Sequence, residues 1–130
     1  MLNREHTIIL AVDPGSEFVG WSKAEGHSVS ADYGVEGPYL FCDKFTSRSI
    51  DVDRVVIERF DIRQFTNESQ LTVEVIGIIK WLCFNRNIPV GFVTPSSKRK
   101  FLEHVKQHGL RSHAADAEAI RMWDLSYGVW

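Results

Sequence analysis

Three acidic residues carry the strongest chemical signal in this sequence. Asp13 directly follows the apolar run 7–12, and Glu58 ends a second apolar run. Asp116 lies in an alanine-rich segment, and His113, three residues before it, shares its helix face. Taken singly, each has an ordinary structural interpretation: Asp13 as a turn residue, Glu58 on the solvent side of an edge strand, Asp116 on a solvated helix face and His113 in a helix cap.

Taken together, these residues indicate a cation site. If two strand ends and a small-residue helix meet at one edge of a sheet, their carboxylates repel one another unless a cation lies among them, because no lysine stands in these segments. Oxygen ligands select Mg²⁺ or Mn²⁺. Two such ions about 4 Å apart are the usual arrangement for in-line phosphodiester cleavage. The pattern therefore predicts metal-assisted hydrolysis of a phosphodiester.

Hydrophobic periodicity and turn signals predict the elements that position these residues. We expect strands at 7–12, 18–23, 27–33, 53–60 and 88–93, the first three as an antiparallel meander. We expect helices at 68–85, from a Thr94 cap to Gly109, and from a Ser112 cap onward, with a possible short helix within 38–50. A meander followed by alternating strands and helices predicts a mixed α/β sheet with helices on its faces.

Three ordered motifs resemble those of RuvC-type Holliday-junction resolvases, which belong to the ribonuclease H-like superfamily. Residues 9–16, with Gly20 beyond, are similar to the first motif, and residues 56–58 to the second. Residues 113–119 are similar to the C-terminal His/Asp-x-x-Asp-Ala-x-Ala helix. The resemblance implies one nuclease domain over residues 1–130, with a ribonuclease H-like mixed five-stranded sheet flanked by helices. The compact chain is most similar to the bacteriophage branch.

The resemblance also implies the activity and its residues. It predicts a Mg²⁺-dependent endonuclease, with Mn²⁺ as a substitute and two ions per site, that makes paired nicks in a four-way DNA junction. The catalytic, metal-binding positions match Asp13, Glu58, His113 and Asp116. Bacterial relatives insert into the junction a Phe three residues after the Glu, whereas Phe60 stands only two residues after Glu58.

The segment 94–111 is the predicted DNA-binding stretch, because its basic residues give it a net charge of +4 in a chain of net charge −2. The alternative interpretation is a solvated helix face. The helix N-terminus at 94–97 could also receive a phosphate. The predicted DNA-binding residues here and around Glu58 are Lys98, Arg99, Lys100, Lys106, Arg111, Arg59, Phe60 and Arg63.

The composition excludes several protein classes. With 130 residues, 44% hydrophobic and 25% charged, the chain is expected to be a soluble globular domain rather than a disordered or polytopic membrane protein. The apolar run 7–12 is too short for a signal peptide or membrane span. Isolated Cys42 and Cys83 predict reduced thiols and a cytoplasmic protein, in the host cytoplasm if the protein is phage-encoded. A zinc site at His104 and His108 lacks a supporting Cys or Glu pattern.

Alternatives to a junction resolvase remain open at this stage. One is a ribonuclease H-like nuclease for flaps, forks or RNA–DNA hybrids, and another is a junction-binding module without catalysis. We expect no nucleotide cofactor. Paired nicks require two active sites at a fixed separation, so a homodimer is expected. Its predicted interface is the long helix, through Ile76, Ile79 and Trp81.

Overall fold

The computed structural model describes residues 3–60 and 66–130. A 3-10 helix at Arg4–His6 comes first. The strands are β1 (Ile8–Asp13), β2 (Val19–Glu25), β3 (Asp32–Glu36), β4 (Arg54–Glu58) and β5 (Val90–Val93). The helices are α1 (Pro38–Arg48), α2 (Asn67–Asn85), α3 (Pro95–Gln107) and α4 (Ser112–Tyr127).

The five strands form one mixed sheet in the order β3-β2-β1-β4-β5. β1, β2 and β3 form the predicted antiparallel meander, whereas β4 pairs parallel to β1 and β5 parallel to β4. Parallel neighbours need a crossover, and α2 supplies the one between β4 and β5. The predicted mixed five-stranded sheet flanked by helices is therefore confirmed.

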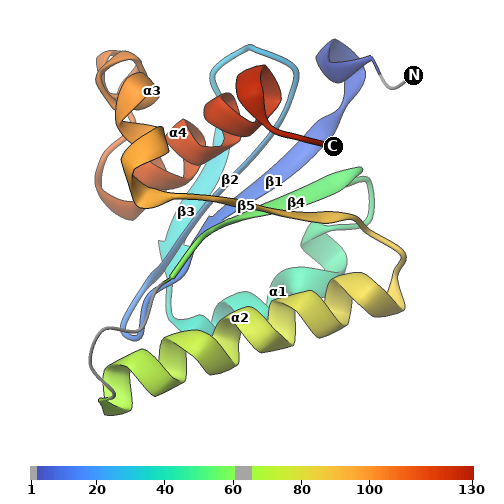
Figure 1. Ribbon diagram of the computed structural model, residues 1–130, viewed down its shortest axis with the longest axis vertical. Helices are drawn as coiled ribbons and strands as arrows, with labels where there is room; N and C mark the ends of the chain where they lie inside the picture. Colours follow the sequence, from blue (N-terminus) through green and yellow to red (C-terminus); the bar gives the residue numbers. More distant parts are fainter. Residues whose placement is uncertain (1–2, 61–65) are drawn as a thin grey trace.

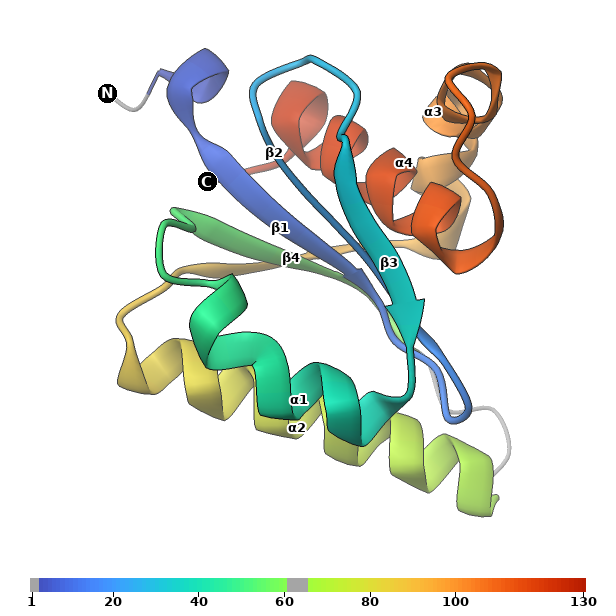
Figure 2. The same cartoon turned by 180° about the vertical axis from the view of Figure 1, so that it is seen from behind.

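Helices cover both faces of the sheet. Figures 1 and 2 show α1 and α2 on one face and α4, with α3 beside it, on the other. Because successive side chains of a strand point to opposite faces, β1 contributes to both cores. Leu10 and Val12 lie in the core beneath α1 and α2. Ile9 and Ala11 pack against Ile120 of α4. This two-sided burial explains why β1 reads as an unbroken apolar run.

Most predicted elements are found within two residues of their expected bounds, but the third strand is not. β3 occupies Asp32–Glu36 rather than 27–33, because the preceding residues form a loop bound to α4. The ambiguous segment 38–50 contains α1, which begins at Pro38 and buries Phe41 and Phe45.

Two further sequence predictions are wrong in detail. Arg111, not Ser112, is the N-cap of α4, and Ser112 is its first residue, with a φ of +59°. Ile79 of α2 is fully buried in the core, so it cannot offer interface surface. Ile79 lies four residues after buried Val75, and this spacing places both on the inner face of the helix.

No helix among the described residues is long and apolar enough to span a membrane. Cys42 and Cys83 are both free, as predicted, and burial raises the pKa of each thiol.

Candidate active site

Asp13 and Glu58 lie at the ends of two adjacent parallel strands. The register pairs Val12 with Ile57, so the residue that follows each stands at the same edge of the sheet. The alternation of β1 places Asp13, two residues after Ala11, on the side covered by α4. Asp13 is only 8% exposed, which is unusual for a carboxylate and does not fit the turn interpretation.

The N-terminal half of α4 brings His113 and Asp116 to the same edge. Its inner face is made of small residues, which let the helix lie close to the sheet; those buried are Ala114, Ala115, Ala117 and Ala119. One close approach is at Gly20 of β2, which pairs with Asp13. A Cβ atom on Gly20 would lie 2.2 Å from the carbonyl oxygen of His113, so only glycine fits there.

Three of the four predicted ligands converge. His113 Nδ1 lies 3.1 Å from Asp13 Oδ2. One ligand atom from each of Asp13, His113 and Asp116 lies within 4.8 Å of the others, the one such group of three or more donors in the part of the chain described here. Two carboxylate oxygens and an imidazole nitrogen fit a divalent cation such as Mn²⁺ or Mg²⁺. The residues present are therefore suited to holding the predicted metal.

Glu58, the fourth predicted ligand, is instead held by a lysine. Lys98 Nζ lies 2.9 Å from Glu58 Oε2 and 3.1 Å from its Oε1. The same Nζ lies 3.7 Å from Asp116 Oδ1. The expectation that no lysine lies among the carboxylates is therefore wrong. Lys98 is distant from Glu58 in the sequence, and it reaches the site because α3 follows β5, which lies beside β4.

The electrostatics of the site follow from this crowding. Burial raises the pKa of Asp13 to about 9, and the hydrogen bonding and charge of Glu58 act in the same direction. Burial alone would lower the pKa of Lys98, but its contacts with Glu58 and the charges of Asp13 and Asp116 raise it above its ordinary value. Without a metal, Lys98 is the cation of the site and Asp13 retains its proton at neutral pH.

The raised pKa of Asp13 predicts how metal-free stability depends on pH. Between its ordinary pKa of 3.8 and the folded value of about 9, the folded protein holds a proton that the unfolded chain releases. Stability should therefore fall as pH rises through this window. Melting temperatures in a chelator from pH 5 to 9 measure this effect. An Asp13→Asn variant should show a flatter profile, and an identical profile would contradict the assignment.

Mn²⁺ affinity should rise with pH, because the metal displaces the proton of Asp13.

The predicted DNA-binding residues are distributed over two regions. Arg99, Lys100, Lys106 and Arg111 are exposed on α3 and the turn that follows it. Lys98 is the exception, because it belongs to the carboxylate cluster. Arg63 lies outside the described residues.

Beside Glu58, a groove of about 370 Å³ is lined by Arg59, Phe60, Val73, Ile76, Lys80 and Phe92. Phe60 and Phe92 are 39% and 45% exposed, and Lys80 Nζ lies 5.8 Å from the centroid of the Phe92 ring. The sequence does not indicate that Lys80 and Phe92 line this groove, because each reads as an ordinary residue of its helix or strand.

The rings of His104 and His108 lie 4.5 Å apart, and His108 Nδ1 lies 3.0 Å from the carbonyl oxygen of His104. In the part of the chain that the structure covers, no third donor joins them. The geometry gives no support to zinc binding here.

Comparison with known proteins establishes the fold. No family model and no curated protein matches this sequence. Among solved structures, the chain is similar to Thermus thermophilus RuvC in complex with a Holliday junction substrate, with a TM-score of 0.68 and 16% identity over 91% of this chain and 92% of that chain. A second Thermus thermophilus RuvC structure gives a TM-score of 0.61 and 16% identity over 90% and 92%. The fold is thus the ribonuclease H-like fold of RuvC, as the motifs predicted.

Proposed function

We propose that this protein is a divalent-metal-dependent endonuclease that acts on branched DNA, and that it resolves four-way junctions by paired nicks. The observation that carries the proposal is the convergence of Asp13, His113 and Asp116 at the end of β1. The similarity to a RuvC structure solved with a Holliday junction substrate supports the choice of substrate.

The chain's own residues define the chemistry of the site. Asp13, His113 and Asp116 would hold the cation, and Glu58 lies near enough to Asp13 to raise its pKa. When bound, a divalent cation lowers the pKa of a water nucleophile and stabilises the leaving oxygen. Lys98 partly neutralises Glu58 and Asp116, which reduces the repulsion of a phosphate at this edge of the sheet.

The groove beside Glu58 has the composition of a site for an unstacked base. Its exposed aromatic rings, Phe60 and Phe92, offer stacking surfaces for a base. Arg59 and Lys80 supply positive charge for the phosphates of the DNA backbone. The groove lies on the side of the sheet covered by α2, whereas Asp13 and Glu58 face α4. The groove and the carboxylates meet only at the end of β4, where Arg59 directly follows Glu58. A branch point, where the continuous stacking of the duplex is interrupted, is the DNA structure in which a base can enter such a groove at least cost.

A panel of labelled substrates tests the proposal. Four-way junctions, flaps, forks and RNA–DNA hybrids should be incubated with the protein in Mg²⁺, in Mn²⁺ and in a chelator. We expect metal-dependent, symmetric cuts in the junction. Preferential cutting of a flap or hybrid would support the alternative nuclease, and tight junction binding without any cutting would support the non-catalytic module.

The basic face of α3 gives a prediction about salt. A combined Arg99→Ala and Lys100→Ala variant should weaken junction binding and reduce the slope of log K against log salt by about two, one unit for each lost phosphate contact. Binding titrations between low and moderate salt measure the slope. The matched control removes two positive charges, Lys44 and Arg86, from the layer of α1 and α2. Equal slopes in both double variants would show that α3 is only a solvated face.

We also propose a homodimer formed through the outer face of α2. Trp81 and Phe84, three residues apart on the helix, are 63% and 79% exposed. Exposed aromatic residues on one helix face mark an interaction surface, and two active sites at a fixed distance suit paired nicks.

Replacing Trp81 by Glu should convert the dimer into a monomer, because the charge would be buried in the interface. Sedimentation velocity at micromolar concentration, with and without junction DNA, measures the change. Tyr39→Glu on α1, where Tyr39 is 68% exposed, is the matched control and should leave the dimer intact. A wild-type protein that remains monomeric on junction DNA contradicts the proposal.

A further inference from the structure

Glu118 and Arg121 form a fully buried ion pair on α4, just after the metal-binding segment. Both side chains are 0% exposed. Arg121 Nε lies 2.6 Å from Glu118 Oε1, and Arg121 Nη2 lies 2.8 Å from Glu118 Oε2. Apolar residues of similar volume often serve stability as well as a buried ion pair does. Stability alone therefore gives no reason for this pair to stand here.

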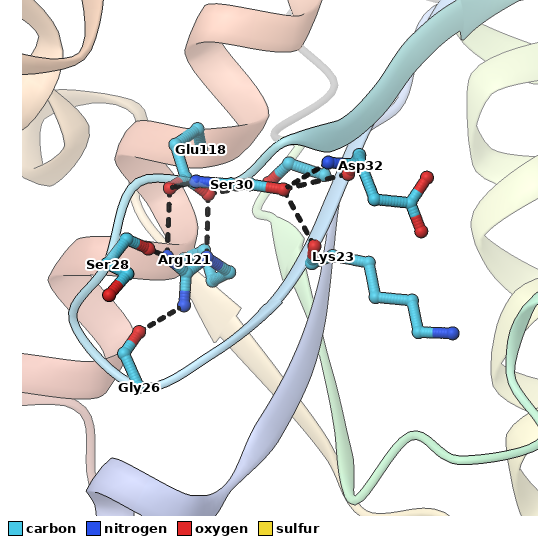
Figure 3. A network of polar contacts seen from close by, with 8 residues as sticks. Lys23, Gly26, Ser28, Ser30, Asp32, Glu118 and Arg121 are labelled. Carbon is cyan, nitrogen blue, oxygen red and sulfur yellow. Dashed lines mark hydrogen bonds and ion pairs between the residues drawn. The ribbon is translucent and has the colours of Figure 1, made fainter. Parts of the chain in front are cut away.

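The Glu118 carboxylate joins the helix to the sheet. Its Oε1 accepts a hydrogen bond from Ser22 Oγ of β2 at 3.0 Å. Its Oε2 accepts one from the backbone N–H of Ser30, in the loop before β3, at 2.8 Å. Figure 3 shows the carboxylate between α4 and this loop. Each carboxylate oxygen is thus used twice, once by Arg121 and once by another segment of the chain.

Hydrogen bonds of Arg121 and Ser30 hold the loop 26–31 around the Glu118 carboxylate. Arg121 donates to the carbonyl oxygens of Gly26 and Ser28 at 2.6 and 2.7 Å. The Ser30 hydroxyl lies 2.7 Å from the carbonyl oxygen of Lys23 and 2.8 Å from that of Asp32, and its single proton can bond to either. The network, drawn in Figure 3, therefore links α4, β2 and the loop 26–31 into one hydrogen-bonded unit.

This unit lies next to the site along both elements. On α4, Glu118 comes two residues after Asp116. On β2, Ser22 comes two residues after Gly20, which pairs with Asp13 and contacts the backbone of His113. The missing side chain of Gly20 thus allows α4 to lie close to β2. The hydrogen bond from Ser22 to Glu118 keeps the helix at this separation from the strand.

We propose that Glu118 is a positioning residue for the metal ligands. Its hydrogen bond to Ser22 fixes the separation of α4 from β2, and thereby the placement of His113 and Asp116 relative to Asp13. Arg121 balances the buried charge and ties in the loop. The inference deepens the proposed function, since it rests on those three residues being the metal ligands.

A second buried ion pair on the same helix provides a matched control. Arg54 Nε lies 2.8 Å from Asp124 Oδ2, and the two side chains are 9% and 2% exposed. This pair ties α4 to the start of β4, about 12 Å along the helix axis from Asp116. Losing it should affect stability as much as losing the Glu118–Arg121 pair, but it lies at the other end of α4 and β4 and bonds to no residue of the site.

The experiment compares apolar replacements of the two pairs. Glu118→Leu with Arg121→Met is set against Arg54→Met with Asp124→Leu, and Ser22→Ala removes only the hydrogen bond to the sheet. Mn²⁺ dissociation constants are measured without DNA, at a temperature where every variant is folded, and melting temperatures are recorded in parallel. We expect the Glu118–Arg121 replacement to weaken Mn²⁺ binding about tenfold or more, and Ser22→Ala to weaken it in the same direction. The control should lower the melting temperature only.

Several results would overturn the inference. One is equal Mn²⁺ affinity in the two double variants. Another is an unchanged Mn²⁺ dissociation constant in Ser22→Ala. If the Glu118–Arg121 replacement does not fold, the Ser22→Ala result alone tests the inference. A wild-type protein that binds no Mn²⁺ would overturn both this inference and the proposed function. Mn²⁺ binding that depends on Glu118, together with a failure to cut any branched DNA, would refute the nuclease proposal and leave this inference standing.

Discussion

Replacing Asp13 by Asn should abolish cleavage of a four-way junction while leaving junction binding intact. The change keeps the shape of the side chain but removes the charge that a divalent cation requires from this ligand. Loss of one preorganised electrostatic group typically lowers a rate by about 10²–10³, and loss of the metal should lower it further. Binding should persist, because Asp13 is already uncharged at neutral pH in the absence of metal and the basic residues of α3 are unchanged.

The same variant should be more stable than the wild type in the absence of metal. At neutral pH the folded wild-type protein must take up a proton at Asp13, because burial raises its pKa to about 9. Asn has no such requirement. A variant that is more stable and yet inactive would separate loss of catalysis from loss of folding, an outcome that a merely structural Asp13 could not produce.

Single-turnover cleavage in Mg²⁺ and junction binding in Ca²⁺ measure the two effects. Asp43 is an exposed residue of α1. Asp43→Asn makes the same chemical change away from the site and should behave as the wild type. If Asp13→Asn cuts the junction in Mg²⁺ at nearly the wild-type rate, the metal assignment is wrong.

The fold and the meeting of Asp13, His113 and Asp116 at one edge of the sheet could be predicted from the sequence, because they depend on local patterns. The apolar run of β1 marks a strand buried on both faces, and a carboxylate at its end is visible as an exception. The alanines around Asp116 mark a helix in close contact with the sheet. These signals need no knowledge of the tertiary structure, since periodicity and residue size alone carry them.

The features that could not be predicted depend on contacts between distant segments. The salt bridge of Lys98 with Glu58 spans 40 residues, and the hydrogen bond of Ser22 with Glu118 spans 96. The position of Glu118 in the sequence pattern of its helix does not show whether its charge is buried in an ion pair or exposed to solvent. The bounds of the third strand depend on such contacts too, because residues 26–31 form a loop that bonds to Glu118 and Arg121 of α4, and the ladder of β3 with β2 begins only at Asp32.

Replacing Gly20 by Ala should disable the site without changing any ligand. The added Cβ would lie 2.2 Å from the carbonyl oxygen and 2.5 Å from the Cβ of His113, so the start of α4 must move away from β2. The atoms that the new Cβ would meet belong to the backbone and Cβ of a helix residue, which cannot rotate aside as the end of a flexible side chain would. His113 and Asp116 move with the helix, whereas Asp13 remains on the sheet.

A displacement of about 1 Å at reacting groups can cost about 10² in rate, so cleavage should fall at least that far. Mn²⁺ binding should weaken in parallel, and overpacking should lower stability by about 1–3 kcal/mol. Single-turnover cleavage, Mn²⁺ titration and thermal melting measure the three effects.

Gly37→Ala is the control, because a Cβ at Gly37 meets nothing within 4 Å and its φ of −63° suits any residue. A Cβ at Gly37 would enter open space, whereas a Cβ at Gly20 would meet the helix that carries His113 and Asp116. Normal cleavage by Gly20→Ala would mean that the site tolerates displacement of α4, and that the close contact of this helix with β2 is not what aligns His113 and Asp116 with Asp13.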